Sequence, residues 1–290
     1  MNKVEQRRAL EVAVKAAWAA GSLLRRNLGA AKTIHHATQH DLKIEMDVRC
    51  QRLITERLLA AFPTSAVLGE EGIAGELTSA ARWVVDPLDG TVNFAYGIPH
   101  ACVSIALQVR GPDPAWRGAR GGTSIRDNSA KMSPEAAEFQ TVVGAVYDPF
   151  VDELWTAIRG ERARLNGRTV RVSGRRRLGE AVVSLGFGKR AAVLDQMLPV
   201  FTALVHRVRK IWIMGSAALA LTYVATGRFD AYLETGIRLW DIAAGGLIVE
   251  CAGGSFRHRR LAQEHAYDML ASNGRLGAAL QRHFGLTPRA

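Results

Sequence analysis

The 290-residue sequence lacks any run of about 18 apolar residues free of charge, which a membrane-spanning helix needs. Its first residues, Met-Asn-Lys-Val-Glu-Gln-Arg-Arg, also lack the apolar core of a secretory signal peptide. Because neither a membrane span nor a secretion signal is indicated, we expect a cytoplasmic protein with no membrane partner. A chain of this length can bury a large core, either as one α/β domain or as two closely packed halves.

Cysteine is also scarce, since only Cys50, Cys102 and Cys251 occur, far apart in the sequence. An odd number of cysteines without metal-type spacing indicates neither a disulfide framework nor a zinc site. We also find no internal repeat, so the pattern does not indicate a repeat architecture.

Acidic residues are outnumbered, because 38 lysines and arginines face 27 aspartates and glutamates and give a formal net charge of +11. The positive charge is concentrated in local clusters, at Arg25–Arg26, Arg162–Arg171, Arg175–Arg177 and Arg257–Arg260. Such charge could steer an anionic substrate or attract nucleic acid. No cluster is interleaved with aromatic residues in a pattern that suggests base stacking. We therefore interpret the charge as a solvated basic surface and expect no nucleic-acid partner.

Helical and strand patterns both occur along the whole chain, which is typical of an α/β fold. Helical spacing of apolar residues predicts helices over 4–28 and 45–61, and in the second half over about 191–208, 216–226 and 241–252. Apolar runs ended by turn residues predict strands at 66–68, 82–86, 101–109 and 142–147, then at about 181–186, 210–213 and 229–233. Segment 110–140, rich in Gly, Pro and Arg, is expected to be a long irregular loop.

Two carboxylates, Asp86 and Asp89, stand at the end of the apolar strand 82–86 and are followed at once by Gly90 and Thr91. Carboxylates are suitable ligands for Mg²⁺, and backbone amides at the start of a helix can bind phosphate oxygens. The same residues also suit a type I turn. This segment alone therefore leaves both interpretations open.

Two further acidic segments are equally ambiguous alone. Glu70 and Glu71 follow the strand 66–68, but paired glutamates in a polar loop are usually solvated. Asp241 begins the helix predicted over 241–252, where a carboxylate is expected on capping grounds. Only a partnership with Asp86 and Asp89 would favour a metal-binding role for them.

Taken in order, these segments resemble the inositol monophosphatase family of Mg²⁺-dependent, lithium-sensitive phosphomonoesterases. The motifs that carry the resemblance are Gly69-Glu70-Glu71, Asp86-Pro-Leu-Asp89-Gly-Thr91 and Trp240-Asp241-x-Ala-Ala-Gly245. It spans nearly the whole chain and includes Asp41-Leu-Lys-Ile-Glu-Met-Asp47 and Gly215-Ser216-Ala217-Ala218. Three separated motifs in this order are specific for the family, although each motif alone is only a weak indication of it.

The resemblance implies a site for two or three Mg²⁺ ions. Its ligands would be Glu70, Asp86, Asp89, Asp241 and the backbone carbonyl of Leu88. In the family the nucleophile is a metal-bound water, which here would be activated through Glu70 and the hydroxyl of Thr91, with Asp47 in a supporting role. The physical chemistry agrees, because clustered carboxylates repel one another unless cations lie between them, and two ions can clamp the attacking and leaving oxygens.

The resemblance also implies a phosphorylated polyol or sugar as substrate. Phosphate would rest on the amides of Gly90 and Thr91, and Asp241 would face the leaving oxygen. The residues matching the family's hydroxyl contacts are Gly215, Ser216, Ala217 and Glu234. Because the Glu234 carboxylate can accept hydrogen bonds from a polyol, we favour myo-inositol monophosphate. Histidinol phosphate, fructose 1,6-bisphosphate and adenosine 3′,5′-bisphosphate are the alternatives.

For the fold, the resemblance implies a layered α-β-α-β-α sandwich of mixed α/β (α+β) class. We expect an N-terminal α+β subdomain over 1–148, with a mostly antiparallel sheet and most of the metal ligands. An α/β subdomain over 149–290 would carry Asp241 and the substrate contacts. The site would lie in the cleft between them, because ligand sites often lie where two subdomains meet. Family members are commonly homodimers, so a homodimer is expected.

Two competing functions have sequence support. Haloacid dehalogenase phosphatases also place an Asp pair after a strand, but two positions apart, whereas Asp86 and Asp89 are three apart. A covalent phospho-aspartate is therefore not expected. A basic scaffold on the same fold that binds RNA or protein would explain the net charge. It would not require every metal-site residue type to be present.

Overall fold

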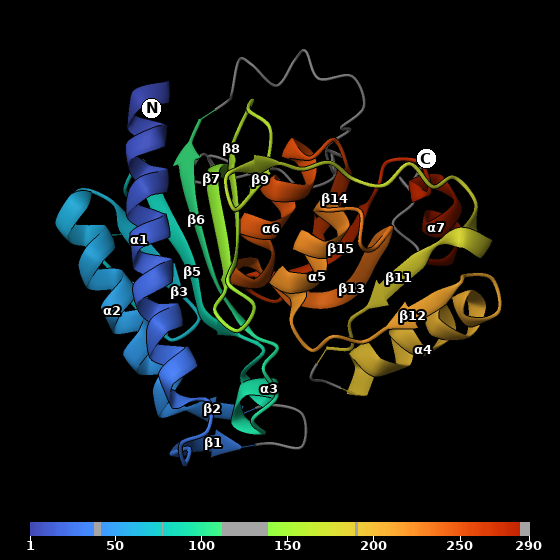
Figure 1. Ribbon diagram of the computed structural model, residues 1–290, viewed down its shortest axis with the longest axis horizontal. Helices are drawn as coiled ribbons and strands as arrows, with labels where there is room; N and C mark the ends of the chain where they lie inside the picture. Colours follow the sequence, from blue (N-terminus) through green and yellow to red (C-terminus); the bar gives the residue numbers. More distant parts are fainter. Residues whose placement is uncertain (38–41, 77, 112–138, 189–190, 285–290) are drawn as a thin grey trace.

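The polypeptide folds into five layers that alternate helices and sheets (Figure 1). The structure, a computed structural model, describes residues 1–37, 42–76, 78–111, 139–188 and 191–284. In order across the molecule, Figure 1 shows a layer of helices, a large sheet, central helices, a smaller sheet and outer helices. The layered α-β-α-β-α sandwich is confirmed. Within the described residues, no helix is both long and apolar enough to cross a membrane.

The first layer consists of α1 (Lys3–Asn27) and α2 (Glu45–Ala61), which pack on one face of the large sheet. Helix α1 begins with a capping box, in which Asn2 and Glu5 each accept the backbone N–H of the other. Its buried face is lined mainly by alanines, so α1 lies close to the sheet. Trp83 and Phe94 are the largest fully buried side chains of this core.

The large sheet has eight strands in the order β10-β9-β8-β7-β6-β5-β3-β4. They are β3 (Ala66–Gly69), β4 (Gly72–Ala74), β5 (Ala81–Asp89), β6 (Cys102–Arg110), β7 (Phe139–Asp148), β8 (Glu153–Ile158), β9 (Arg164–Leu165) and β10 (Arg168–Thr169). Only β3 and β5 pair in parallel, so their carboxyl ends lie at the same edge. This edge carries Glu70 and Asp86, and the Glu70 amide donates to the carbonyl of Val85.

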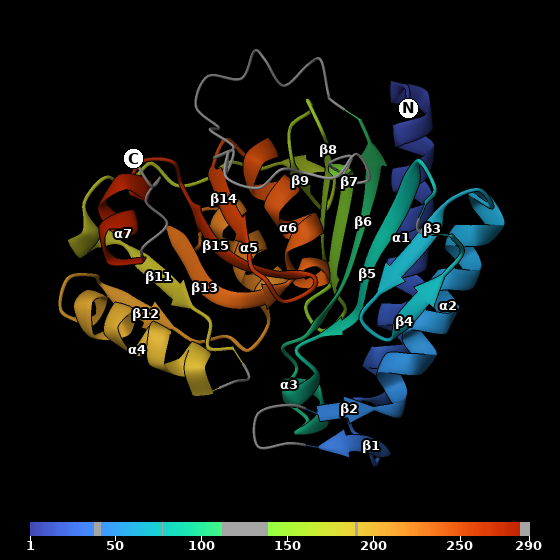
Figure 2. The same cartoon turned by 180° about the vertical axis from the view of Figure 1, so that it is seen from behind.

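The middle layer consists of α5 (Ala217–Ala225) and α6 (Leu239–Cys251), which lie between the two sheets (Figures 1 and 2). Both helices are apolar almost all round, as burial on every side requires. Gly144 of β7 lets α6 approach closely, because a Cβ there would lie 3.0 Å from the carbonyl oxygen of Ala244. The largest buried cluster surrounds these helices, so the two sheets share one core.

The smaller sheet has five strands in the order β12-β11-β13-β15-β14, covered on its outer face by α4 and α7. Its elements are β11 (Val182–Leu185), α4 (Ala191–Val205), β12 (Lys210–Trp212), β13 (Ala231–Arg238), β14 (Ser255–Arg260), β15 (Ala266–Ser272) and α7 (Gly277–Phe284). Strands β11, β12 and β13 are parallel, whereas β14 and β15 pair antiparallel. The remaining short elements are β1 (Ile34–Ala37), β2 (Leu42–Ile44), α3 (Thr91–Ala95) and the 3-10 turn η2 (Leu178–Glu180).

Two expected boundaries differ from the structure. Strands β8 to β10 extend the large sheet to Thr169, beyond the boundary expected at residue 148, because Asp148 and Pro149 reverse the chain into a hairpin within that sheet. The segment expected to be irregular, 110–140, also has strand residues at both of its ends. Arg110 and Phe139 pair across β6 and β7, with the guanidinium 4.8 Å from the ring centre. Its remaining part, 112–138, lies outside the described residues.

Candidate active site

Three carboxylates from different layers meet at one point. Asp86 and Asp89 stand at the end of β5 in the large sheet, and Asp241 lies in the first turn of α6. One carboxylate oxygen from each of the three lies within 4.8 Å of the others. Asp86 and Asp89 are only 1% and 8% exposed. The pairing of β5 with β6 shifts register between them, so both can reach the cluster although they are three residues apart.

Burial opposes charge on these groups. It raises the pKa of Asp86 well above the usual value for aspartate, and the charges of Glu70, Asp89 and Asp241 raise it further. Burial and the charge of Asp241 also raise the pKa of Asp89 to about 6. To be fully ionised at neutral pH, carboxylates this close need positive charge between them. Oxygen donors of this kind fit a hard divalent cation such as Mg²⁺.

Asp89 is held by the N-terminal end of α5. Its carboxylate accepts hydrogen bonds from the Ser216 hydroxyl at 2.7 Å and from the amides of Ala218 at 2.6 Å and Ala217 at 3.2 Å. Helix N-termini favour negative charge, which explains the contact. Ser216 and Ala217 were predicted to contact substrate hydroxyls. In the structure, the Ser216 hydroxyl and the Ala217 amide donate to this carboxylate, which lies 127 and 128 residues earlier in the chain, and their contact with substrate stays a prediction.

Asp241 combines two roles that appeared to compete in the sequence. It lies at the third position of α6, not at the cap, and its carboxylate accepts the backbone N–H of Arg238 at 3.0 Å. The helix therefore starts two residues earlier than predicted. The same carboxylate belongs to the three-residue cluster. The hydrogen bond from the Arg238 amide therefore also orients it toward Asp86 and Asp89.

Thr91 and Asp47 form a second polar group beside this cluster. The Thr91 hydroxyl lies 3.0 Å from the Leu88 carbonyl oxygen and 3.3 Å from a carboxylate oxygen of Asp47. Asp47 also accepts the N–H of Ile44 and so closes the first turn of α2. Burial raises the pKa of Asp47 to about 7. This carboxyl can therefore take up or release a proton near neutral pH.

The glutamate pair of residues 70 and 71 has two separate environments. Glu70 is not among the three clustered carboxylates, yet its charge helps to raise the pKa of Asp86, so it lies within electrostatic reach. The Glu71 side chain is 6% exposed and pairs with Lys43 of β2, which the sequence analysis missed. Its hydrogen bond to Glu71 raises the pKa of Lys43 and keeps a positive charge near Asp47 and Glu70.

Two glycines allow close approach around α3. Gly90 has a φ of 100°, and a Cβ there would lie 3.0 Å from the carbonyl oxygen of His100. Asn93 donates to the carbonyls of His100 at 2.8 Å and Met214 at 2.9 Å, and so links α3 to the segment before α5. Gly215, with a φ of 68°, packs against Asn93. No local pattern in the sequence gives Asn93 a role, because its partner Met214 lies 121 residues away.

Glu234 lies on β13, where its carboxylate accepts a hydrogen bond from the hydroxyl of Tyr232. Burial raises the pKa of Tyr232 well above its usual value, and the charges of Glu234, Asp89 and Asp241 add to this effect. The tyrosine therefore stays protonated at neutral pH. These contributions also show that the pair lies within electrostatic reach of the carboxylate cluster.

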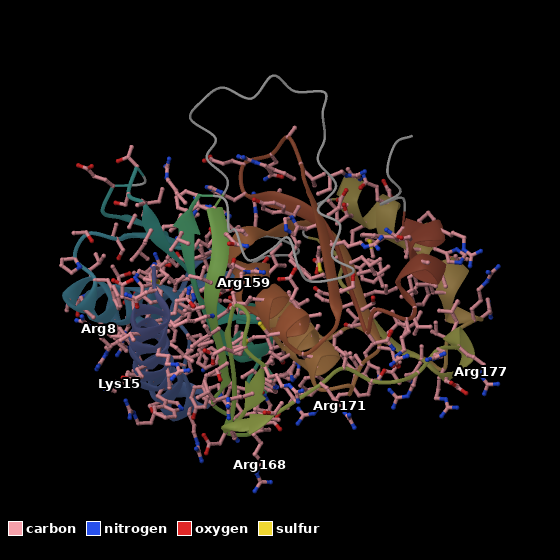
Figure 3. All side chains as sticks on the ribbon, turned by 90° about the horizontal axis from the view of Figure 1, so that it is seen from above. Arg8, Lys15, Arg159, Arg168, Arg171 and Arg177 are labelled. Carbon is pink, nitrogen blue, oxygen red and sulfur yellow. The ribbon has the colours of Figure 1, made fainter. Side chains whose placement is uncertain are left out.

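The exposed arginines of the segment after β9 are not part of this site. Figure 3 shows Arg168, Arg171 and Arg177 pointing outward from one edge of the protein. In the same segment, Arg175 pairs with Asp230 and donates to the carbonyl of Gly227, just beyond the C-terminal end of α5. Asp89 is held at the other end of this nine-residue helix, roughly 13 Å away.

Comparison with known proteins places the chain among phosphatases. The model of the inositol monophosphatase family matches residues 5–112 and 136–285. The chain is 38% identical over 253 residues to inositol monophosphatase 2 of Solanum lycopersicum, covering 84% of this chain and 85% of that protein. It is 37% identical over 253 residues to the Nus factor SuhB of Xylella fastidiosa, covering 86% and 81% respectively. The crystal structure of the extragenic suppressor protein suhB from Bartonella henselae has a TM-score of 0.79 at 31% identity, covering 96% of this chain and 99% of that one.

The layered fold, the buried carboxylate cluster and these relatives define a phosphomonoesterase. The chain belongs to the inositol monophosphatase family. The family resemblance carried by the three acidic motifs is thereby confirmed.

We expect metal-free protein to lose stability as the pH rises from about 4 to about 8. An unfolded aspartate ionises near pH 4, whereas folding raises the pKa of Asp89 to about 6 and that of Asp47 to about 7. The unfolded chain therefore releases these protons first, and the stability present below about pH 4 is lost as the pH passes through the folded values. Urea unfolding in EDTA, followed by circular dichroism across this range, measures the effect.

Asp86→Asn removes a buried carboxyl whose ionisation the fold opposes, and it should be more stable than wild type in metal-free buffer near pH 8. The matched control is Asp195→Asn, because Asp195 is exposed on α4. A stability that rises with pH in EDTA, or equal stability of both variants at pH 8, would contradict this electrostatic account.

Proposed function

We propose that the chain hydrolyses the phosphate monoester of a small polyol in a Mg²⁺-dependent reaction, with myo-inositol monophosphate as the favoured substrate. The observation that carries the proposal is the convergence of Asp86, Asp89 and Asp241 from two layers into one cluster, in which both Asp86 and Asp89 are buried. The relatives named inositol monophosphatase support the choice of substrate class.

The residues that would hold two or three Mg²⁺ ions are Glu70, Asp86, Asp89, Asp241 and the carbonyl of Leu88. When bound, the ions supply positive charge that offsets the clustered carboxylates, activates water and polarises the phosphate. The chain contributes the arrangement of the donors. The α5 N-terminus fixes Asp89, and the Arg238 amide fixes Asp241.

The remaining groups would bind the substrate and move protons. The Thr91 hydroxyl would orient the attacking water beside Glu70, and Asp47, with a pKa of about 7, would take up a proton through Thr91. The amides of Gly90 and Thr91 would bind phosphate oxygens, and Asp241 would face the leaving oxygen. Glu234 would accept hydrogen bonds from polyol hydroxyls, while Gly215 would shape the pocket wall beside Asn93.

We expect Asp89→Asn to lower kcat/KM for a phosphate monoester by about 100-fold or more, because the variant loses one of the negatively charged ligands that would bind the cation. The measurement is Mg²⁺-dependent release of inorganic phosphate, with Asp195→Asn as the control for charge removal at an exposed position. Full activity of Asp89→Asn would contradict the metal-site assignment. A phosphate mimic trapped covalently on Asp86 would overturn the mechanism, and salt-sensitive RNA binding without hydrolysis would favour the scaffold function.

A substrate panel tests the finer claim. With Mg²⁺ present, we expect turnover of myo-inositol monophosphate to exceed that of histidinol phosphate, fructose 1,6-bisphosphate and adenosine 3′,5′-bisphosphate. Glu234 would repel the second phosphate of the two bisphosphates, and histidinol phosphate has no free hydroxyl to donate to it. Millimolar Li⁺ should inhibit the reaction. Robust turnover of the bisphosphates alone would refute the substrate choice, and indifference to Li⁺ would refute the expected lithium sensitivity.

A further inference from the structure

Strand β13 presents two polar side chains toward the carboxylate cluster. Tyr232 and Glu234 are two residues apart, so both project from the same face of the strand. Tyr232 belongs to the core around α5 and α6, whereas Leu233 between them belongs to the core beneath α4 and α7. Tyr232 and Glu234 therefore face the middle layer, in which the α5 N-terminus binds Asp89 and α6 carries Asp241.

The Tyr232 hydroxyl donates a hydrogen bond to the Glu234 carboxylate. The two residues differ in exposure, since the tyrosine is 3% exposed whereas the glutamate is half-buried. A buried aromatic ring has few alternative rotamers, while a glutamate alone has several that compete with a binding-competent one. The rigid Tyr232 hydroxyl thus holds the Glu234 carboxylate in one orientation. The side chain then loses less conformational entropy when a ligand hydroxyl binds.

Gly186 provides the space in which this carboxylate lies. It follows β11, which lies beside β13 (Figure 1). Its amide donates to the carbonyl of Leu233 at 3.0 Å. A Cβ on Gly186 would lie only 1.8 Å from a carboxylate oxygen of Glu234 and 2.8 Å from the Tyr232 hydroxyl oxygen. Any larger residue at 186 must displace the carboxylate.

We infer that Tyr232 is a positioning residue and Gly186 a specificity-determining position, which together hold Glu234 as a fixed acceptor for a substrate hydroxyl. The inference rests on the proposed function and extends it to residues outside the metal site. It predicts that the pair contributes to recognition of a hydroxyl-bearing phosphate monoester. It contributes nothing to a monoester that lacks hydroxyls, because such a substrate offers Glu234 no donor.

The experiment compares kinetics on two substrates, myo-inositol 1-phosphate and p-nitrophenyl phosphate, both with Mg²⁺. Tyr232→Phe should raise KM for the polyol phosphate about tenfold and leave kcat within about twofold, since a hydrogen bond to a charged group is weakened. Gly186→Ala should act in the same direction. Neither variant should change the kinetics for p-nitrophenyl phosphate, whose retained hydrolysis also shows that the variants fold.

A matched control and a double variant separate positioning from packing. Tyr147→Phe makes the same chemical change at a tyrosine whose hydroxyl donates to Asp152 in another layer, and it should leave both substrates unaffected. In a Glu234→Gln background, Tyr232→Phe should add less than a twofold effect, because the two residues act as one unit.

Equal losses on both substrates, or a Tyr232→Phe variant that matches Tyr147→Phe on the polyol phosphate, would overturn the inference and leave the proposed phosphatase activity standing. Wild-type hydrolysis of p-nitrophenyl phosphate without any hydrolysis of the polyol phosphate would refute the inference together with the substrate choice. Hydrolysis of neither compound would contradict the proposed function itself.

Discussion

Electrostatic repulsion among three clustered carboxylates is the constraint around which this protein is organised. Asp86 and Asp89 are buried and Asp241 is partly buried beside them, where each negative charge opposes the next. Such an arrangement costs free energy in the folded chain unless positive charge enters it. Selection for packing alone would not gather these groups from two layers. Their proximity therefore indicates a site that is complete only with bound cations.

The same constraint explains why the two sheets share their central helices. The α5 N-terminus donates two amides and a hydroxyl to Asp89, and the first turn of α6 carries Asp241. Both helices pack against both sheets, so the distance between Asp86 and Asp241 depends on one shared core. Asn93 adds a further link by bonding the carbonyl of Met214. The geometry of the site is thus fixed by packing that extends across the molecule.

The sequence predicts the long elements of this fold well, because their patterns are local. Helices α1 and α2 and strands β5, β6 and β7 lie close to where apolar periodicity places them. Strand β14 was missed, since Ser-Phe-Arg-His-Arg-Arg has little apolar alternation and is defined by its pairing with β15. The acidic motifs likewise identified the carboxylates but not their partners. The contacts of Asn93 with Met214 and of Ser216 with Asp89 join residues more than a hundred positions apart, which no local pattern contains.

Calorimetric titration of the metal-free protein with Mg²⁺ tests most directly whether the carboxylates of the two layers form one cation site. At about pH 7 we expect Mg²⁺ binding to release protons, because the raised pKa values leave these carboxyls partly protonated before the cation enters. Binding should be strongly weakened in both Asp89→Asn and Asp241→Asn. If Asp241→Asn bound Mg²⁺ as wild type does, the carboxylates of the two layers would not form one shared site.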